Sequence, residues 1–453
     1  KKGNQKMSKK ISIDQINQLR ANVSDDKHTK VVRNAMIKTN SNELSMDWDR
    51  YRKIDHSFSH VVSGEMPATN QKSSGRCWGF AGLNLFRIYL GRKHNLKDFQ
   101  FSQSYFMFWD KLEKANYFLE SILSTLDEKS DSRIIMHLLQ TPTEDGGQWD
   151  MWANLIKKYG VIPQAEMSES FSSSQSSEMN KMLSRKLREN AHDLRKKSSE
   201  GSSNDDLSKL KNHMIEEIFK MLTMHLGTPP ETFDWQVRDK DKKFSRFENL
   251  TPQSFYQEHV GLNLDDYVCL INCPMSDKEY NKIYTVEHLG NVVEGNAIRY
   301  LNVESNTMKE ACIKSIKDDN PVWFGCDVGK HFHRDLGVMD TELFDYEMFY
   351  DTGFKMNKAE RLEYGQSQMT HAMLFTGVDL DKNQNAVKWR VENSWGDKGG
   401  NKGYHIMTDK WFDEYNYEIV VHKDYISDEL NEIFESGEAI PLKPWDPMGA
   451  LAK

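Results

Sequence analysis

The sequence predicts an α+β protein, with helical patterns in the first half of the chain and strand patterns in the second. Apolar residues recur at helical spacing from Trp78 onward, from Trp149 to Tyr159 and from Leu207 to Leu226. Beyond Tyr267 the apolar runs become shorter and strand-like. We therefore expect a largely helical region followed by a sheet-rich region.

Composition narrows the class of protein. The chain has 453 residues, of which 38% are hydrophobic and 28% charged, so it is long enough for a large core and lies on the polar side of globular proteins. Its formal net charge of -8 argues against a generally basic surface that binds nucleic acid, and it fits peptide or small-molecule substrates better. No segment is apolar enough to span a membrane, so we expect no membrane partner.

The start of the chain and the cysteine count indicate the compartment. Lys1–Arg20 is charged and lacks the apolar stretch of a secretory signal, and Met7 is a candidate native start. Five cysteines are too few for a disulfide framework in a chain of this size, and their number is odd. We therefore expect a reducing, cytoplasmic location.

We divide the chain into five parts that we expect to form one integrated unit. They are an N-terminal extension at 1–66, a helical part at 67–166, a mainly helical insertion at 167–266, a β-rich part at 267–440 and a C-terminal arm at 441–453. Gly160 is expected to end one helix, and Asp239–Lys243 to form a solvated loop. The expected strands are Tyr267–Ile271, Ala297–Val303, Val322–Cys326, Met373–Val378, Lys388–Glu392 and Gly403–Met407.

Cys77 is the strongest candidate for a nucleophile. It follows the turn Ser73–Gly75 and opens a helical pattern, so the thiol is expected at a helix N-terminus, where a thiolate is stabilised. Gln71, six positions earlier, can place a side-chain amide beside the sulfur. That amide and the backbone N–H of Cys77 have a spacing that suits an oxyanion hole.

His371 is the preferred base among 15 histidines. It opens a strand-like run, which would hold its ring on a rigid element at the edge of a cleft. The next strand ends in Glu392-Asn393-Ser394-Trp395-Gly396, where Asn393 can hydrogen-bond the imidazole and Trp395 can shield that bond from water. Such a third group fixes the tautomer and the orientation of a catalytic histidine.

Other interpretations of these residues remain open. A lone cysteine such as Cys77 is more commonly a buried structural thiol, and Trp395 can be a core aromatic. Gly146 and Gly147 fit a turn that precedes a helix. His331 and His333, in HFH, alternate as strand neighbours that can face one side as metal ligands. The other four cysteines are interpreted as small core residues, because no second Cys or His pair has metal-site spacing; they are Cys269, Cys273, Cys312 and Cys326. We therefore expect no metal and no cofactor.

Seven segments, in order along nearly the whole chain, resemble the papain superfamily of cysteine peptidases, and within it the bleomycin hydrolase and aminopeptidase C family. They are Asn70–Trp78, Leu96–Tyr105, Asp110–Leu119, Pro142–Gln148, Thr370–Leu374, Val391–Gly396 and Trp445–Lys453. The separation of Cys77 from His371 is about twice the ~130–150 residues of papain-like enzymes. The helical insertion accounts for the excess and favours the bleomycin hydrolase branch.

The resemblance implies a papain-like two-lobed fold, with a helical lobe, an antiparallel β lobe, a large helical insertion and extensions at both ends. It also implies roles for individual residues. Cys77 would be the nucleophile, His371 the general base and acid, Asn393 its orienter and Gln71 the oxyanion donor. Gly146 and Gly147 map onto the shelf along which these enzymes bind substrate backbone.

The same resemblance implies a thiol aminopeptidase of broad specificity. In this family the C-terminal arm lies in the active-site cleft and offers its terminal carboxylate to the substrate's free N-terminus. The matching residues here are Gly449–Lys453, with Ala452 and Lys453 as the expected substrate contacts. The family also forms homohexamers whose active sites face an internal cavity.

Two further functional hypotheses involve the same residues or the same assembly. A papain-like endopeptidase or an acyltransferase would keep the cysteine chemistry but lose the preference for a free N-terminus. Binding of single-stranded nucleic acid, an activity described in the family, is disfavoured by the acidic net charge. Peptides with free and with acetylated N-termini distinguish an aminopeptidase from an endopeptidase.

Overall fold

The computed structural model describes residues 10–452. The candidate start Met7 and the last residue, Lys453, lie outside this range. The described chain divides into two compact units, one comprising the residues up to Asp55 with Glu342–Lys355, and the other His56–Thr341 with Met356 onward. Within residues 10–452, every helix is too short or too polar to cross a membrane.

The smaller unit is helical. Its main helices are α1 (Ile13–Ser24), α2 (Lys27–Met36), α3 (Ser41–Ser45), α4 (Trp48–Tyr51) and α14 (Tyr346–Tyr350). The amphipathic pattern at 11–19 becomes α1, whose N-cap Ser12 accepts a hydrogen bond from the Gln15 N–H at 3.1 Å. Backbone bonds such as Asp47 N–H to the Leu343 carbonyl, at 2.9 Å, join the two parts of the unit. Residues 342–355 therefore belong with the N-terminal helices although the sequence separates them by about 290 positions.

The larger unit is built on a mixed sheet of twelve strands in the described residues. In chain order these are β1 (His60–Val61), β4 (Tyr267–Ile271), β5 (Lys282–Val286), β6 (Tyr300–Asn302), β7 (Val322–Cys326), β8 (Phe332–His333), β9 (Val338–Met339), β10 (His371–Leu380), β11 (Ala386–Glu392), β12 (Tyr404–Thr408), β13 (Asn416–His422) and β14 (Ala439–Leu442). The order across the sheet is β14-β5-β6-β4-β13-β7-β10-β11-β12-β9-β8, with β1 beside β10. All six predicted strands are confirmed: β4 and β7 have the predicted bounds, and the other four differ at their ends.

The sheet centre is buried and mostly antiparallel. Strand β10 pairs with β7 on one side and β11 on the other, so that His371 lies opposite Cys326 and Leu374 opposite Glu392. The side chains of β7 are all buried, as are the first eight of β10. This burial explains why both strands have near-continuous apolar sequences. It also fixes the backbone that carries His371.

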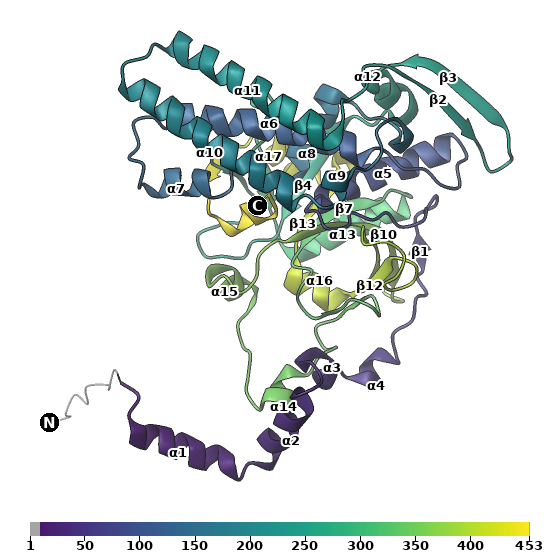
Figure 1. Ribbon diagram of the computed structural model, residues 1–453. Helices are drawn as coiled ribbons and strands as arrows, with labels where there is room; N and C mark the ends of the chain where they lie inside the picture. The colour runs from purple at the N-terminus through teal and green to yellow at the C-terminus, as the bar shows by residue number, and fades with distance from the viewer. Residues whose placement is uncertain (1–9, 453) are drawn as a thin grey trace. The chain divides into compact units, whose positions relative to one another are not determined.

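Helices pack on this sheet and on one another. They are α5 (Cys77–Lys93), α6 (Gln103–Leu123), α7 (Arg133–Gln140), α8 (Trp149–Tyr159), α9 (Phe171–Ser174), α10 (Ser177–Ser199), α11 (Asn204–Leu226), α12 (Pro252–Phe255), α13 (Ser305–Lys317), α15 (Lys358–Glu363), α16 (Asp409–Tyr415) and α17 (Asp428–Ser436). Short 3-10 or π turns lie at Gln164–Glu166, Tyr256–Val260, Leu264–Asp266, Lys423–Tyr425 and Pro447–Ala452. Helix α5 packs against β10, and α6, α10 and α11 lie side by side (Figure 1).

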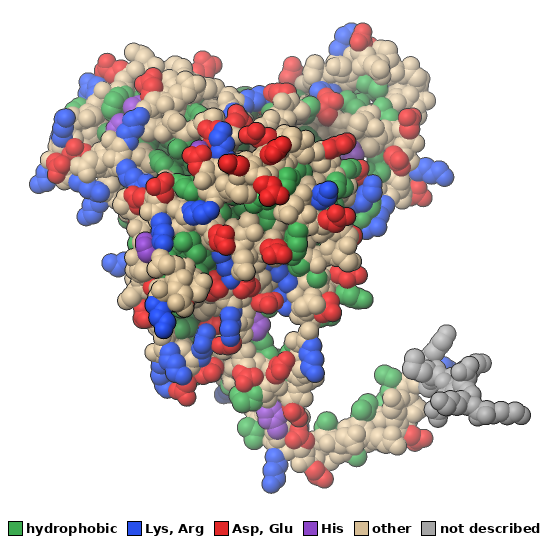
Figure 2. Space-filling model, turned by 180° about the vertical axis from the view of Figure 1, so that it is seen from behind, with side chains coloured by type: hydrophobic (Ala, Val, Ile, Leu, Met, Phe, Trp, Pro, Cys, Tyr) green, Lys and Arg blue, Asp and Glu red, His purple; other side chains and the backbone are tan. Residues whose placement is uncertain are grey.

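The segment 167–266 is more mixed than predicted. It contains the two long helices α10 and α11, and also the antiparallel hairpin of β2 (Phe233–Arg238) and β3 (Phe244–Leu250) (Figure 1). Phe233 and Trp235 are buried while Asp234 and Gln236 are exposed, which is strand periodicity. The predicted loop Asp239–Lys243 is the turn of this hairpin. Figure 2 shows one face of the molecule, where acidic and basic side chains are interspersed.

Candidate active site

Cys77 is the first residue of α5 and lies against the first residues of β10. The residue is only 4% exposed. Burial raises the pKa of the Cys77 thiol to about 11, while backbone N–H groups of Ala372, Trp78 and Cys77 itself bond the sulfur and favour its thiolate. The N–H of Ala372, the residue after His371, thus places the sulfur beside the start of β10. The predicted position of Cys77 at a helix N-terminus is confirmed.

Buried ionic contacts hold the turn before Cys77. Arg76 forms a two-pronged ion pair with Glu169, with nitrogen to oxygen distances of 2.9 and 2.7 Å, and its Nε donates to the Ser74 hydroxyl. The N–H of Gly75 donates to Asp145 Oδ2 at 2.9 Å. Such a doubly bonded guanidinium has little freedom, so the loop approaches the thiol with a fixed backbone.

Asp145 connects this turn to two helices. Lys111 Nζ of α6 lies 2.8 Å from Asp145 Oδ1, Asn180 of α10 donates to the same oxygen at 2.8 Å, and the Ser176 hydroxyl donates to Oδ2. Burial alone raises the pKa of Asp145, but the charge of Lys111 and these donors hold it well below its usual range. Asp145 is therefore ionised at neutral pH, and it lies within electrostatic reach of the Cys77 sulfur.

His371 has a defined hydrogen bond and a neighbouring aromatic ring. Its Nε2 lies 2.9 Å from Asn393 Oδ1, an oxygen that also accepts the Ser394 N–H at 2.8 Å. An amide oxygen only accepts, so Nε2 carries the proton and Nδ1 has the free lone pair. The Trp395 ring lies 4.8 Å from the imidazole, centre to centre. Burial is the main cause that lowers the pKa of His371 to about 4. The hydrogen bond to Asn393 raises this pKa and only partly offsets the effect of burial, while the positive charge of Arg334 lowers it further.

Gln71 joins the two halves of this arrangement. Its backbone N–H donates to the Ser394 carbonyl at 2.8 Å, and its Oε1 accepts from the Ser394 hydroxyl at 2.6 Å. Its Nε2 donates to the Ser74 carbonyl at 2.7 Å, which uses one of the two amide hydrogens. The side chain therefore lies between the Ser74 turn before Cys77 and the residue that follows Asn393.

The predicted glycine pair lies on the other side of the same turn. A Cβ on Gly147 would lie 2.5 Å from ring carbons of Trp78, so this glycine is required by packing as well as by any contact with substrate. Trp78 Nε1 donates to the Asp145 carbonyl at 2.6 Å. The Gly146 carbonyl accepts from Lys114 Nζ at 2.5 Å. The backbone of 145–147 is thus fixed next to Cys77 and α5.

The C-terminal arm approaches this glycine pair. Asp446 pairs with the buried Lys278 at 3.0 Å, and the Met448 carbonyl accepts from Gln148 Nε2 at 3.4 Å and from the Tyr300 hydroxyl at 3.3 Å. Gln148 directly follows Gly147. The predicted contact residue Lys453 is outside the described residues.

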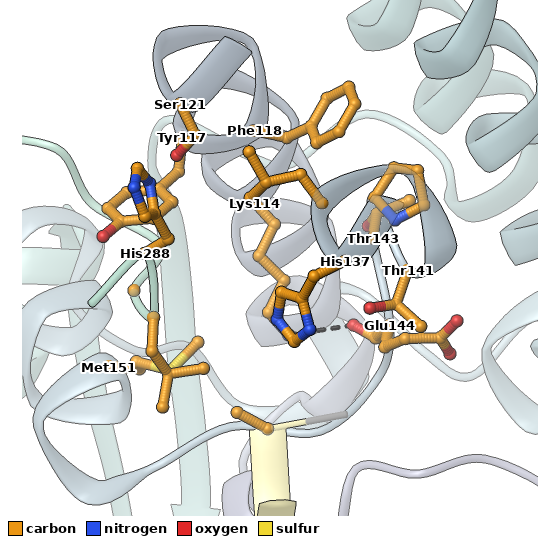
Figure 3. Close-up of a pocket in the computed structure, with 15 residues that line it drawn as sticks. Lys114, Tyr117, Phe118, Ser121, His137, Thr141, Thr143, Glu144, Met151 and His288 are labelled. Carbon is orange, nitrogen blue, oxygen red and sulfur yellow. Dashed lines mark hydrogen bonds between the residues drawn. The ribbon is translucent and has the colours of Figure 1, made fainter. Parts of the chain in front are cut away.

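Ala452, the last described residue, lines a cavity of about 70 Å³. Figure 3 shows this cavity, in which Lys114 reaches the Glu144 carbonyl and His288 lies across from Glu144. Lys114 also binds the Gly146 carbonyl, so the cavity lies beside the backbone of the glycine pair.

The structure also locates the other candidates. Cys269 donates to the buried Glu418, and the remaining three cysteines are buried. His331 stacks on Tyr415 at 5.9 Å. Within residues 10–452 no group of three or more His, Cys, Asp or Glu side chains is arranged to hold a metal ion.

Comparison with known proteins identifies the family. The model of the Peptidase C1-like family matches residues 10–449. The chain belongs to this family. It is 45% identical to Aminopeptidase C of Listeria innocua over 98% of this chain and 100% of the relative, and 46% identical to Bleomycin hydrolase of Homo sapiens over 89% and 90%. The crystal structure of PepW from Lactobacillus rhamnosis HN001 aligns with a TM-score of 0.96 and 43% identity, over 98% of this chain and 100% of that chain.

Membership of the Peptidase C1-like family agrees with the predicted family resemblance, and the structure confirms the predicted mixture of helix and sheet. Sequence patterns did not single out Asp145, Ser394 or Lys278. Asp145 and Ser394 lie inside the segments Pro142–Gln148 and Val391–Gly396 that carry the family resemblance, whereas Lys278 has no local signal, because its partner Asp446 is far away in the sequence.

Proposed function

We propose that this chain is a cysteine aminopeptidase, which removes N-terminal residues from peptides with broad specificity through a covalent acyl-enzyme. Cys77, His371, Asn393 and Gln71 carry the chemistry. The family membership supports the peptidase activity, and the position of the C-terminal arm beside the glycine pair carries the preference for N-termini.

Acylation begins with a proton transfer from the Cys77 thiol to Nδ1 of His371. The sulfur attacks the scissile carbonyl carbon, and the negative oxygen that forms is bound by the Cys77 N–H and the second amide hydrogen of Gln71. The carbon–nitrogen bond then breaks as His371 returns the proton to the leaving amine. Water, deprotonated by His371, next breaks the carbon–sulfur bond, and the thiol regains its proton.

The resting pair is neutral in this scheme. Burial raises the pKa of Cys77 to about 11 and lowers that of His371 to about 4, so at pH 7 the thiol is protonated and the imidazole is free to accept a proton. Asn393 accepts from Nε2–H, which leaves the lone pair of Nδ1 as the acceptor for the thiol proton in the proposed transfer. Trp395 excludes water from that bond, which strengthens it.

The arm supplies the argument for exopeptidase action. Gln148, which directly follows the glycine pair, binds the Met448 carbonyl, so the described part of the arm lies next to the backbone along which we propose that the substrate binds. We propose that Ala452 and Lys453 present the chain's terminal carboxylate to the substrate's α-ammonium.

A cavity of about 470 Å³ beside the Ser74–Gly75 turn is suited to the first side chain of the substrate. It is open and lined mainly by residues of polar or charged type, which fits broad specificity. Its lining residues are Ser73, Ser74, Gly75, Glu144, Ser176, Ser177, Asn180, Lys181, Ser184 and Arg188.

Further features of the proposal come from the family resemblance. We propose a papain-like two-lobed arrangement, in which α5–α8 belong to one lobe and the sheet that carries His371 to the other. We also propose a cytoplasmic homohexamer that admits peptides with a free N-terminus and needs no cofactor. Sedimentation of the purified chain tests the hexamer directly.

The decisive experiment compares a peptide that has a free N-terminus with its acetylated form. The full chain should cleave the free peptide from its N-terminus and leave the acetylated peptide intact. Cys77→Ala should abolish hydrolysis, whereas Cys312→Ala, which changes a buried cysteine of α13, should retain it. Equal cleavage of both peptides would indicate an endopeptidase, and transfer of the acyl group to an added amine an acyltransferase.

The arm has its own test. Lys278→Met removes the cation that holds Asp446, so we expect the arm to loosen and the ratio of acetylated to free peptide cleavage to rise at least about tenfold, equivalent to 1.4 kcal/mol. Deletion of Ala452 and Lys453 should raise the same ratio. Lys443→Met, which removes an exposed cation at the start of the arm and leaves the Lys278–Asp446 pair intact, is the matched control. An unchanged ratio in both test variants would refute the role of the arm.

A further inference from the structure

Arg334 forms the outer end of a stack that begins at His371. The imidazole lies 4.8 Å from the Trp395 ring, and the guanidinium carbon of Arg334 lies 4.0 Å above the centre of that ring. The side chain of Arg334 is exposed, while Trp395 is half-buried. The order from the inside outward is therefore imidazole, indole, guanidinium.

The backbone of Arg334 is held in place. Arg334 lies in the short turn between β8 and β9, which is closed by a bond from the Gly337 N–H to the His333 carbonyl at 2.8 Å. A Cβ on Gly399 would lie 2.9 Å from the Arg334 carbonyl oxygen, so a second loop packs directly on this turn. The Gly400 N–H also donates to the Asp335 carbonyl at 3.0 Å. The cation therefore has a fixed origin, which lowers the entropy lost on binding an anion.

The charge of Arg334 is not neutralised by a neighbour. Among residues 10–452, no acidic side chain forms an ion pair with it, and its recorded contact is the face of Trp395. Stacking uses the flat face of the guanidinium and leaves the N–H donors at its edge directed to solvent. An exposed, stacked guanidinium with free donors is suited to a carboxylate.

The direction of the stack indicates which part of the substrate reaches Arg334. In the proposed function His371 protonates the leaving amine, so the leaving residue lies on the His371 side of the scissile bond. The two stacking distances place the guanidinium carbon within about 9 Å of the imidazole centre. In a dipeptide the carboxylate of the leaving residue lies about 3.5 Å from its nitrogen, so it is within reach of the Arg334 donors.

We infer that Arg334 binds the free α-carboxylate of the leaving residue and so favours dipeptides over longer peptides and amides. This inference rests on the proposed function, because only an acyl-transfer site with His371 as the acid gives the leaving residue this position. A longer peptide has a neutral amide where a dipeptide has its carboxylate, and it gains no ion pair with Arg334.

The test measures kcat and KM for alanyl-alanine, alanyl-alaninamide and an alanyl arylamide. Arg334→Gln should lower kcat/KM for alanyl-alanine at least about tenfold, mainly through KM, and change the two neutral substrates less than about twofold. Arg334→Lys keeps the charge but loses the planar fork, so it should recover part of the loss. Arg246→Gln removes another exposed arginine that lies over an aromatic ring, remote from the site, and should change nothing.

Two results would overturn the inference alone. One is an equal loss on alanyl-alanine and alanyl-alaninamide, because Arg334 would then only support Trp395. The other is an unchanged ratio between the acid and the amide. A wild-type chain that hydrolyses none of the three substrates, the arylamide included, would instead overturn the proposed function and this inference with it.

Discussion

Asp145 offers a direct test of how the loop before Cys77 is held. Asp145→Asn keeps the shape of the side chain and an oxygen for the Gly75 N–H, but it removes the negative charge that faces Lys111. Both side chains are buried, with exposures of 8% for Asp145 and 0% for Lys111. Removing one partner of a buried ion pair costs about 3–5 kcal/mol, since the other charge is left without compensation. We expect the free energy of unfolding to fall by about that amount.

Urea unfolding followed by tryptophan fluorescence measures this difference. The double variant Asp145→Asn/Lys111→Met removes both charges and should recover most of the stability lost in the single variant. Glu200→Gln breaks an exposed ion pair with Lys197 and should leave the midpoint unchanged. The reasoning is refuted if Asp145→Asn unfolds within about 1 kcal/mol of the wild type, or if the double variant is the least stable of the three.

The same variant has a defined pH dependence. The folded-state pKa of Asp145 is held well below its usual range, so the stability that its charge contributes is complete above the unfolded pKa of about 3.9 and is lost as the pH falls toward the folded value. The wild type and Asp145→Asn should therefore differ by a constant amount at neutral pH and converge in acid. In addition, Asp145 raises the pKa of Cys77, so alkylation of the thiol at fixed alkaline pH should be faster in the variant.

Two further predictions concern the site itself. The pKa values of about 4 for His371 and about 11 for Cys77 predict that kcat/KM is constant between about pH 5 and 9. Below about pH 4 kcat/KM should fall, because His371 is then protonated and no longer accepts the thiol proton. A pH profile of kcat/KM with an acid limb near pH 6.5 would contradict this. Gly147→Ala would place a Cβ 2.5 Å from the Trp78 ring, so it should lower the free energy of unfolding by about 1–3 kcal/mol, measured in urea, and also lower kcat. Gly329→Ala is the control and should change neither quantity, because no atom lies closer than 3.9 Å to its Cβ position.

Local sequence patterns predicted most of the elements that carry the site. The helix Trp149–Tyr159 has the predicted bounds, since its apolar periodicity is strong and Gly160, at a φ of +67°, ends it. His371 opens strand β10, as its strand-like run predicted, although the predicted strand bounds were Met373–Val378. The first eight residues of β10 are buried in the sheet and therefore form a long apolar run. In both cases the local pattern of apolar residues directly indicates which side chains are buried.

Other features depend on contacts between residues that are distant in the sequence. The hairpin β2–β3 was not predicted, because the composition of 167–266 is dominated by the polar residues of α10 and α11, and only the alternation around Phe233 and Trp235 indicates strands. The ion pair of Lys278 with Asp446 joins segments about 170 positions apart, and neither residue has a local pattern that indicates its partner. Periodicity describes the burial of a side chain but not the identity of its neighbour.

The segment 167–266 is joined by specific hydrogen bonds to the turn that precedes Cys77, so it is not a separate addition to a smaller enzyme. Ser73 exchanges backbone hydrogen bonds with the residues just before α10, its N–H donating to the Ser174 carbonyl at 2.9 Å and its carbonyl accepting from the Ser176 N–H at 3.3 Å. The Ser176 hydroxyl and Asn180 complete the coordination of Asp145. Without these donors the carboxylate that anchors the Gly75 N–H would be undersolvated. The start of α10 is thus part of the scaffold that positions Cys77. We expect its loss to disturb the position of the thiol more than that of the distant helices.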